Sequence, residues 1–477
     1  MTGFQRFTPQ IGAPLPRIRP ENAGVSPAAV LKMIRSYAEK GLRIHSFLLI
    51  RDGRVYSEGY YAPYAPDLFQ TVYSLSKSFT SVAMGIAEGE GLLSLDEKIE
   101  DIFAEEIKQA GTQPSKELSG LTVRNLLRMG TGQEKESWSG TDHILSFLKE
   151  PFHEMPGEHF RYNTAATYMC AATLWKKGID LEAYLQEKLF GPLGISGAHW
   201  QRCARGICTG GYGLSILPEI IAKFGVLLAG DGVFEGRQLI PKGYLDQATT
   251  KQISNAHHSP NPDWQAGYGY QFWMCQNGSF RGDGMYGQLC VVNRAKNAVL
   301  AMTAFVDDIQ AELSVYFDEI LSQMADAPIP EEPEAFAALQ AELKGLRAAI
   351  QPVVDDGGAI PKSVLGKEYR LGPHSLRVEE EGGKLSLHAS FYGEPVVLPR
   401  GRTGQYLLPT NLGANKTGIA VFSPAVLGYG VRGGKLALRI LSLEFMFDVS
   451  IEIGEDGLNA WHVYDVNHHK RIEHIGF

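Results

Sequence analysis

The stretch Tyr73–Gly91, with the sequence YSLSKSFTSVAMGIAEGEG, decides how the rest of the chain is interpreted. Ser74 and Lys77 stand three residues apart, and a helix that begins at Ser74 brings such residues onto one face. Apolar residues follow at helical spacing, at Phe79, Val82, Ala83 and Ile86. This pattern predicts a helix that is buried in a core and stops at Gly89 or Gly91.

The Ser74–Lys77 pair has the composition of a nucleophile and its base. A serine hydroxyl is a weak nucleophile at neutral pH, and a lysine accepts its proton only when burial or a neighbouring cation lowers the pKa of the amine. A buried helix start provides such an environment, so we predict that Ser74 is the nucleophile and Lys77 the base. The same spacing recurs at Ser146 and Lys149, but inside an amphipathic helix pattern, and we interpret that match as coincidence.

The composition predicts a multidomain globular protein that does not bind nucleic acid or an anionic membrane. The chain has 477 residues, which favours two or three domains, and 45 basic against 53 acidic residues give a net charge of -8. The sequence contains no long run of basic residues, which argues against nucleic acid or an anionic membrane as a partner. We expect a small-molecule or peptide-like substrate instead; the oligomeric state is left open.

Five cysteines show no C-x-x-C spacing, which predicts reduced thiols rather than disulfides or a zinc site. The pairs His257-His258 and His468-His469 lack partners at metal spacing, and no cofactor motif occurs, so neither a metal nor a cofactor is expected. The first twenty residues contain no apolar signal-like segment, and no run reaches the length of a membrane span. A cytoplasmic location is therefore the expectation.

The segment patterns predict an α/β (α+β) catalytic domain over residues 1–326. A helix at 27–40, a hairpin around Asp52-Gly53, and later strands at 267–274, 280–287, 289–292 and 298–305 favour one antiparallel sheet built from both ends of the domain. Residues 95–205 carry helical patterns, which predicts an all-α insertion, and a closing helix is expected at 311–324. We expect this domain to fold without the rest of the chain.

The remaining residues change in composition. Residues 327–360 contain PIPEEPE, an Ala/Leu/Glu-rich helix pattern and DDGG, which predicts a linker with a helix. Residues 361–477 alternate between apolar and polar positions, as from Leu443 to Ile451, and are punctuated by glycine pairs. This rhythm predicts an all-β, barrel-like C-terminal domain without a chemical signature of its own.

Two further stretches carry candidate chemistry. Tyr162 in PGEHFRYNT, beside a Ser/Lys pair, has the chemistry of a proton shuttle. Taken alone, a core aromatic is the more ordinary interpretation in a chain with twenty tyrosines, and Tyr168 and Tyr212 are alternatives. In RGDGMYGQ, Arg281–Gln288, glycines at a strand edge allow a substrate to come close. An N–H of that edge, at Met285, is expected to join the N–H of Ser74 as an oxyanion hole.

In this order, the stretches YSLSKSFT, LLRMGTG, PGEHFRYN and GGYGLS resemble the serine hydrolases related to class C β-lactamases, a group with penicillin-binding peptidases, esterases and oligoamide hydrolases. The resemblance spans about Pro20 to Met324. It implies an acyl-enzyme mechanism on a sheet with a helical insertion. It places the nucleophile, lysine and tyrosine at Ser74, Lys77 and Tyr162. An added C-terminal β domain also occurs in this group.

Two motifs depart from the resemblance. The tyrosine motif is commonly Y-x-N, whereas Asn163 follows Tyr162 directly here; we retain Asn163 as a substrate-binding candidate. The third motif is commonly K-T-G or H-x-G, and residues 282–284 read Gly-Asp-Gly, with Arg281 just before them. We therefore name Arg281 and Gly284 as substrate-binding candidates.

The motif's cation holds the carboxylate in lactamases, so its loss favours an ester or amide substrate over a β-lactam. The resulting prediction is a serine hydrolase that acts on an ester, amide or D-peptide bond, with weak β-lactamase activity left open. The alternative is a penicillin-binding-like or degenerate protein that binds peptides without turnover.

Overall fold

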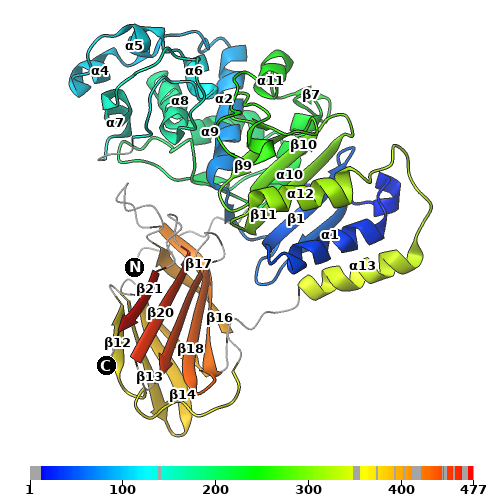
Figure 1. The fold of residues 1–477 in the computed structure, drawn as a ribbon, viewed down its shortest axis with the longest axis vertical. Helices are drawn as coiled ribbons and strands as arrows, with labels where there is room; N and C mark the ends of the chain where they lie inside the picture. Colours follow the sequence, from blue (N-terminus) through cyan, green and yellow to red (C-terminus); the bar gives the residue numbers. More distant parts are fainter. Residues whose placement is uncertain are drawn as a thin grey trace. The chain divides into compact units, whose positions relative to one another are not determined.

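The computed structural model describes residues 12–137, 141–347, 355–371, 374–391, 394–400, 403–410, 421–442, 444, 448–454, 457–464 and 471–475. The chain divides into two compact units (Figure 1). The first comprises Met1–Tyr61 and Ala65–Arg347, and the second comprises Ala62–Tyr64 and Ala348–Phe477. Within the described part, no helix is both long enough and apolar enough to cross a membrane.

A six-stranded antiparallel sheet forms the centre of the first unit. Its strands, in the spatial order β2-β1-β11-β10-β9-β8, come from both ends of the unit, as predicted. They are β1 (Arg43–Arg51), β2 (Arg54–Tyr60), β8 (Trp273–Met274), β9 (Phe280–Gly284), β10 (Gln288–Asn293) and β11 (Ala298–Phe305). Asp52 and Gly53 join β1 to β2 with φ of 50° and 71°, which a tight hairpin turn requires.

Helices cover both faces of this sheet because successive strand residues point to opposite sides. On β1, Leu48 and Ile50 belong to the apolar cluster that contains α2 (Ser76–Gly89) and α10 (Pro218–Ala229). Phe47 and Leu49 belong to the cluster on the other face. That face is covered by α1 (Pro27–Glu39), α12 (Ile309–Tyr316) and the π-helical turn Phe317–Leu321 (Figure 1). The predicted α/β layers are thereby confirmed.

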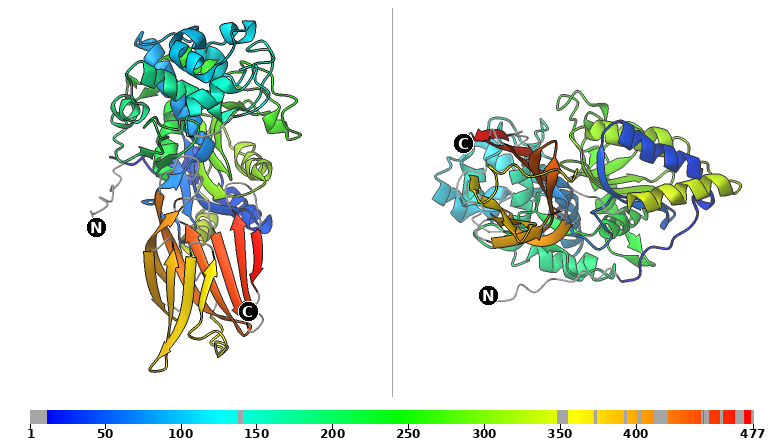
Figure 2. Two further views of the ribbon diagram at one scale, coloured as in Figure 1. Left: turned by 90° about the vertical axis from the view of Figure 1, so that its left-hand side faces the viewer. Right: turned by 90° about the horizontal axis from the view of Figure 1, so that it is seen from below.

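The helix that the composition placed in a linker belongs to the first unit. It is α13 (Pro333–Leu346), which lies beside α1 (Figure 2, right). Leu339 is completely buried in the cluster on that face, and Arg19 lies 4.0 Å from the ring centroid of Phe336. Ser26, the N-cap residue of α1, donates a hydrogen bond to Glu332 just before α13.

A mainly helical segment lies between α2 and α10 in sequence. Its helices are α3 (Ile99–Ile102), α4 (Ala104–Ala110), α5 (Lys116–Gly120), α6 (Val123–Leu127), α7 (His143–Lys149), α8 (Thr164–Lys176), α9 (Leu181–Leu185) and the π-helical turn Gln186–Phe190. α8 packs on α2. A small sheet of β3 (Gln70–Thr71), β5 (Leu214–Ile216) and β4 (His199–Trp200) joins the segment just before the nucleophile to the glycine-rich turn at Gly210–Gly213.

Past α10, the short hairpin of β6 (Val233–Phe234) and β7 (Arg237–Gln238) precedes α11 (Lys242–Ala248).

The aromatic run at 267–274 was predicted as a strand, but only Trp273–Met274 forms one. Gly267 and Gln271 have positive φ of 124° and 65°, which interrupts a β ladder. The Gln271 side chain donates to the carbonyl oxygens of Leu126 and Leu127, which fixes the loop. The aromatic side chains of this run are therefore buried although most of the run forms a loop.

The second unit is all-β, as predicted. One sheet contains β12 (Glu368–Leu371), β13 (His374–Glu381), β14 (Lys384–Phe391) and β15 (Glu394–Pro399). The other contains β16 (Thr403–Thr410), β17 (Val421–Arg432), β18 (Lys435–Ser442), β19 (Asp448–Gly454), β20 (Gly457–Tyr464) and β21 (Arg471–Ile475). Residues from both sheets, including Val378, Leu387, Leu427 and Leu438, share one apolar core (Figure 2, left). Part of the predicted alternation, Leu443 and residues 445–447, lies outside the described residues.

Candidate active site

The amine of Lys77 is the centre of a polar cluster at the start of α2. Its Nζ lies 3.0 Å from Ser74 Oγ, 2.7 Å from the carbonyl oxygen of Gly211 and 3.3 Å from Thr164 Oγ1. The residue is only 1% exposed. These three contacts direct the nitrogen at the serine hydroxyl from a site that bulk water does not fill.

Burial lowers the pKa of Lys77 from its ordinary value of 10.5 to about 7, because desolvation disfavours the charged amine. The carboxylates of Glu136 and Asp283 act in the opposite direction and raise the pKa. An amine with this pKa is neutral in a large fraction of molecules at neutral pH. It can therefore accept the proton of a hydroxyl 3.0 Å away.

Ser74 lies in a 3₁₀ turn, Tyr73–Leu75, and not in the first turn of the α-helix as predicted. The α-helix begins two residues later, at Ser76. The difference arises at Tyr73, whose φ of 45° is unusual for a residue with a side chain and turns the chain sharply before the serine. The three-residue spacing survives because a 3₁₀ turn also places such residues on one side.

Tyr162 approaches the same hydroxyl from the end of the segment that precedes α8. Its side chain interacts with Ser74, and its ring centroid lies 4.9 Å from Lys77 Nζ. The ring stacks on Trp273 with 5.4 Å between centroids and 22° between planes. Burial raises the pKa of Tyr162, and the interaction with Ser74 opposes this shift. The phenol is thus held protonated beside the serine.

The end of β9 lies directly against the turn that carries Ser74. A methyl group added to Gly284 would approach the carbonyl oxygen of Val72 to 2.2 Å, which no side chain tolerates. Glycine is therefore required for this approach. The next residue along the strand direction is Met285, and no hydrogen bond from the main-chain N–H of Ser74 or Met285 is found within the described part of the chain. Both donors remain for a ligand oxygen.

Arg281, predicted to bind substrate, is completely buried. Its Nε donates to Asp283 Oδ2 at 2.8 Å, one terminal nitrogen donates to the carbonyl oxygen of Asp263 at 2.9 Å, and the guanidinium carbon lies 4.2 Å from the ring centroid of Trp264. The guanidinium thus supports the strand from inside. Asp283 is the member of the pair with some exposure, at 8% of its side chain, and sequence reasoning did not single it out.

Asn163, the other predicted substrate ligand, is 3% exposed and caps α8. Its Oδ1 accepts from the N–H of Ala166, and its Nδ2 donates to Gln133. The contact to Lys77 comes instead from Thr164, the third residue of the Y-x-N pattern. Thr164 was missed as a site residue, although its position in the motif was a usable signal.

The remaining candidates lie outside this cluster. Ser146 is buried within α7, where its hydroxyl lies 2.8 Å from Ser137 Oγ, whereas Lys149 is exposed at the end of the helix. The hydroxyl of Tyr168 lies 3.3 Å from Cys203 Sγ. Among the described residues, no group of histidine, cysteine or acidic residues is arranged to hold a metal ion.

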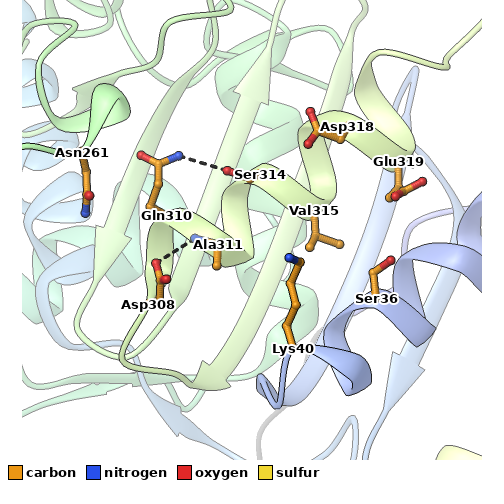
Figure 3. Close-up of a pocket in the computed structure, with 10 residues that line it drawn as sticks. All are labelled: Ser36, Lys40, Asn261, Asp308, Gln310, Ala311, Ser314, Val315, Asp318 and Glu319. Carbon is orange, nitrogen blue, oxygen red and sulfur yellow. Dashed lines mark hydrogen bonds between the residues drawn. The ribbon is translucent and has the colours of Figure 1, made fainter.

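A polar hollow of about 460 Å³ is bordered by α1 and α12 (Figure 3). Ser36 of α1 and Lys40, which follows that helix, line the hollow opposite Ser314 and Asp318. These helices cover the face of the sheet opposite α2, so the hollow is separate from the Ser74 cluster.

Comparison with known proteins places the chain among proteins of similar fold. The β-lactamase family model matches residues 32–308. A protein from Bacillus anthracis assigned as a 6-aminohexanoate-dimer hydrolase is 18% identical, with a TM-score of 0.52 over 66% of this chain and 87% of that one. The octameric penicillin-binding protein homologue from Pyrococcus abyssi is 17% identical, with a TM-score of 0.51 over 91% of this chain and 97% of that one. No curated protein matches the sequence.

Proposed function

Because the chain belongs to the β-lactamase family, we propose that it is a serine hydrolase that cleaves an ester or amide through an acyl-enzyme intermediate. The observation that carries the proposal is the position of Lys77, a buried amine 3.0 Å from a half-buried serine hydroxyl. Burying an amine is costly, so a buried lysine beside a serine hydroxyl supports a role for that amine as a base.

In the first half of the reaction, Lys77 Nζ accepts the hydroxyl proton of Ser74 while Ser74 Oγ forms a bond to the substrate carbonyl carbon. The carbonyl oxygen takes up the negative charge of the tetrahedral intermediate. The N–H groups of Ser74 and Met285 donate to that oxygen. When the bond to the alcohol or amine breaks, the phenol of Tyr162 donates a proton to the leaving group, and the lysine proton restores the phenol.

In the second half, water replaces the leaving group. The water gives its proton to the Tyr162–Lys77 pair and attacks the acyl carbon, and Ser74 leaves with the returned proton. Thr164 and Gly211 hold the amine in place through both halves. The proton that Ser74 loses thus leaves with the alcohol or amine, water supplies the proton that restores the serine, and the enzyme is regenerated.

The test is covalent labelling with a fluorophosphonate, followed by turnover of a panel of p-nitrophenyl esters, D-amino-acid amides and nitrocefin. Ser74→Ala is expected to abolish both labelling and turnover. Ser146→Ala, the matched control with the same sequence spacing, is expected to retain both. Labelling that survives in Ser74→Ala would overturn the mechanism.

The alternative is a penicillin-binding-like protein that acylates without turnover. The specific observation in its favour is the Gly-Asp-Gly third motif, which lacks the cation of the resembling enzymes. This alternative predicts that the fluorophosphonate still labels Ser74. With esters and amides it predicts at most one stoichiometric burst of product and no steady-state turnover.

A further inference from the structure

We propose that Gln288 and Tyr286 are positioning residues that hold the main-chain N–H of Met285 where it and the N–H of Ser74 donate to the same oxyanion. The inference rests on the proposed hydrolase function, and it names residues that act on the reaction without touching the substrate. Both side chains are buried, Gln288 completely and Tyr286 with 1% exposure.

The segment that carries Met285 packs directly against the turn that carries Ser74. A methyl group on Gly284 would lie 2.2 Å from the carbonyl oxygen of Val72 and 3.2 Å from the main-chain nitrogen of Leu75. Val72 and Leu75 stand on either side of the nucleophile in the sequence. The residue before Met285 is therefore close to main-chain atoms on both sides of Ser74, and the direction of the Met285 N–H depends on how the turn after Gly284 is fixed.

The amide of Gln288 ties this turn to the central sheet. Its Nε2 donates to the carbonyl oxygen of Met285 at 3.3 Å and to that of Ala304, in β11, at 2.7 Å. Two carbonyl oxygens need two donors, and the NH₂ group of a glutamine supplies both without a charge. Within the described part of the chain, the Oε1 of Gln288 is buried and has no hydrogen-bond partner. The polar contacts of this side chain are thus those of its donors, which join Met285 to β11.

The ring of Tyr286 links the two segments that carry the oxyanion donors. It lies edge-to-face against Tyr73, with 5.8 Å between centroids, and against Phe305, with 5.1 Å. Tyr73 directly precedes Ser74, and Tyr286 directly follows Met285. Both tyrosines have positive φ, of 45° and 66°, a strained conformation that persists only where the surrounding contacts hold it. The contact between the rings therefore joins the immediate neighbours of the two donors.

These contacts matter because an oxyanion hole works through donors that are fixed before the charge develops. Gln288 fixes Met285 relative to β11, and Tyr286 fixes it relative to the turn of the nucleophile. Neither side chain contacts Lys77 through a hydrogen bond of the described residues. Loss of either contact should leave the nucleophile and its base in place while the Met285 N–H turns away from the oxyanion.

The experiment compares two esters that differ in one atom. They are p-nitrophenyl butyrate and its thiono analogue O-(4-nitrophenyl) butanethioate, in which sulfur replaces the carbonyl oxygen. Sulfur has the longer bond to carbon and is the weaker hydrogen-bond acceptor, so donors placed for oxygen stabilise its anion less. Both esters release p-nitrophenolate. The oxygen-to-sulfur ratio of kcat/KM therefore reports acylation alone and is independent of the fraction of folded enzyme and of the protonation of Lys77.

For the full-length enzyme, this ratio is expected to exceed that of the hydroxide reaction by about a hundredfold. Gln288→Met keeps the length of the side chain but removes its donors. It should lower the ratio by about tenfold and reduce kcat for the oxygen ester, with KM changed by less than about threefold. Tyr286→Leu should lower the ratio similarly, whereas Tyr286→Phe, which keeps the ring, should leave it unchanged.

The matched control for the glutamine is Gln238, which lies in the separate β6–β7 hairpin. Its Nε2 also donates to two main-chain carbonyl oxygens, those of Asp231 at 2.9 Å and Ile240 at 2.6 Å. Gln238→Met should leave the oxygen-to-sulfur ratio as it was. The melting temperature of every variant is recorded, so that a loss of stability is measured separately from a change in the ratio.

An unchanged ratio in Gln288→Met would overturn the inference, as would an equal fall in Gln238→Met. If Gln288→Met does not fold, Tyr286→Leu decides, and an unchanged ratio there refutes the proposal. The proposed function fails separately, when Ser74→Ala still hydrolyses p-nitrophenyl butyrate. An inactive Ser74→Ala, together with an unaltered enzyme whose ratio equals that of hydroxide, would refute the oxyanion arrangement alone.

Discussion

The pH dependence of acylation follows from the buried amine of Lys77. The mechanism uses the neutral amine, and burial places its pKa at about 7. Below that value the lysine is protonated and cannot accept a proton, so kcat/KM for a neutral ester should fall as pH decreases. At pH 6 about one tenth of the plateau activity should remain, and at pH 5 about one hundredth. Above pH 8 the activity should be nearly constant.

This profile separates a buried base from an ordinary lysine. With the ordinary value of 10.5, only about 0.3% of the amine would be neutral at pH 8, and activity would still rise tenfold per pH unit there. The assay is hydrolysis of p-nitrophenyl butyrate between pH 5 and 9.5 at constant ionic strength. Spontaneous hydrolysis is subtracted at each pH, and the melting temperature is recorded in the same buffers.

Removing a charge near the amine tests whether the acidic limb of the pH profile reports the protonation of Lys77. The Glu136 carboxylate raises the pKa of Lys77, so Glu136→Gln should move the acidic limb to lower pH. Glu134→Gln, which has the same exposure and does not act on Lys77, should leave the limb in place. An acidic limb centred above pH 9, or one that Glu136→Gln leaves unmoved, would refute the assignment of Lys77 as a neutral base.

Three further predictions address the tyrosine, the stability cost of the lysine and the domain boundary. Tyr162→Phe should lower kcat by about 10²- to 10⁴-fold with a melting temperature within a few degrees of the original; near-full activity would remove Tyr162 from the mechanism. Lys77→Met should abolish turnover yet raise the melting temperature by several degrees at pH 7, because an amine whose pKa is lowered by folding destabilises the fold at every pH below its ordinary value; an unchanged or lower melting temperature would contradict this. A protein of residues 1–347 should fold alone and keep esterase activity, whereas one of residues 1–326 should melt at least about 5 °C lower in differential scanning fluorimetry, because it lacks α13 and buried Leu339; equal melting temperatures would show that α13 adds nothing.

The local parts of the site were predictable from the sequence. Ser74 and Lys77 are neighbours because they are three residues apart in one turn, and this follows from helical geometry alone. The β1–β2 hairpin also follows from a local signal, the turn residues Asp52-Gly53 with their positive φ. What the sequence did not predict is long-range: the partners Thr164 and Gly211 of the lysine amine are 87 and 134 residues away from it.

The errors have particular causes. The run at 267–274 has the aromatic content of a strand, but Gln271 satisfies main-chain carbonyls of α6 and so fixes a loop. α13 was placed in a linker because proline and glutamate residues flank it. The flanking residues gave no indication that its apolar face packs against α1. In both segments, tertiary contacts outweigh the local pattern.

The glycine at the first position of the third motif is enforced by packing around the nucleophile. Leu75 and Ser78 occupy the space where a side chain on residue 282 would begin, with Leu75 Cδ1 2.4 Å from that point. A lysine there would require the side chains of Leu75 and Ser78 to move. The neighbouring cation, Arg281, is turned to the other face and neutralised by Asp283. The packing around residue 282 thus disfavours a cation at the first position of the motif, and the neighbouring cation, Arg281, is held in an ion pair with Asp283.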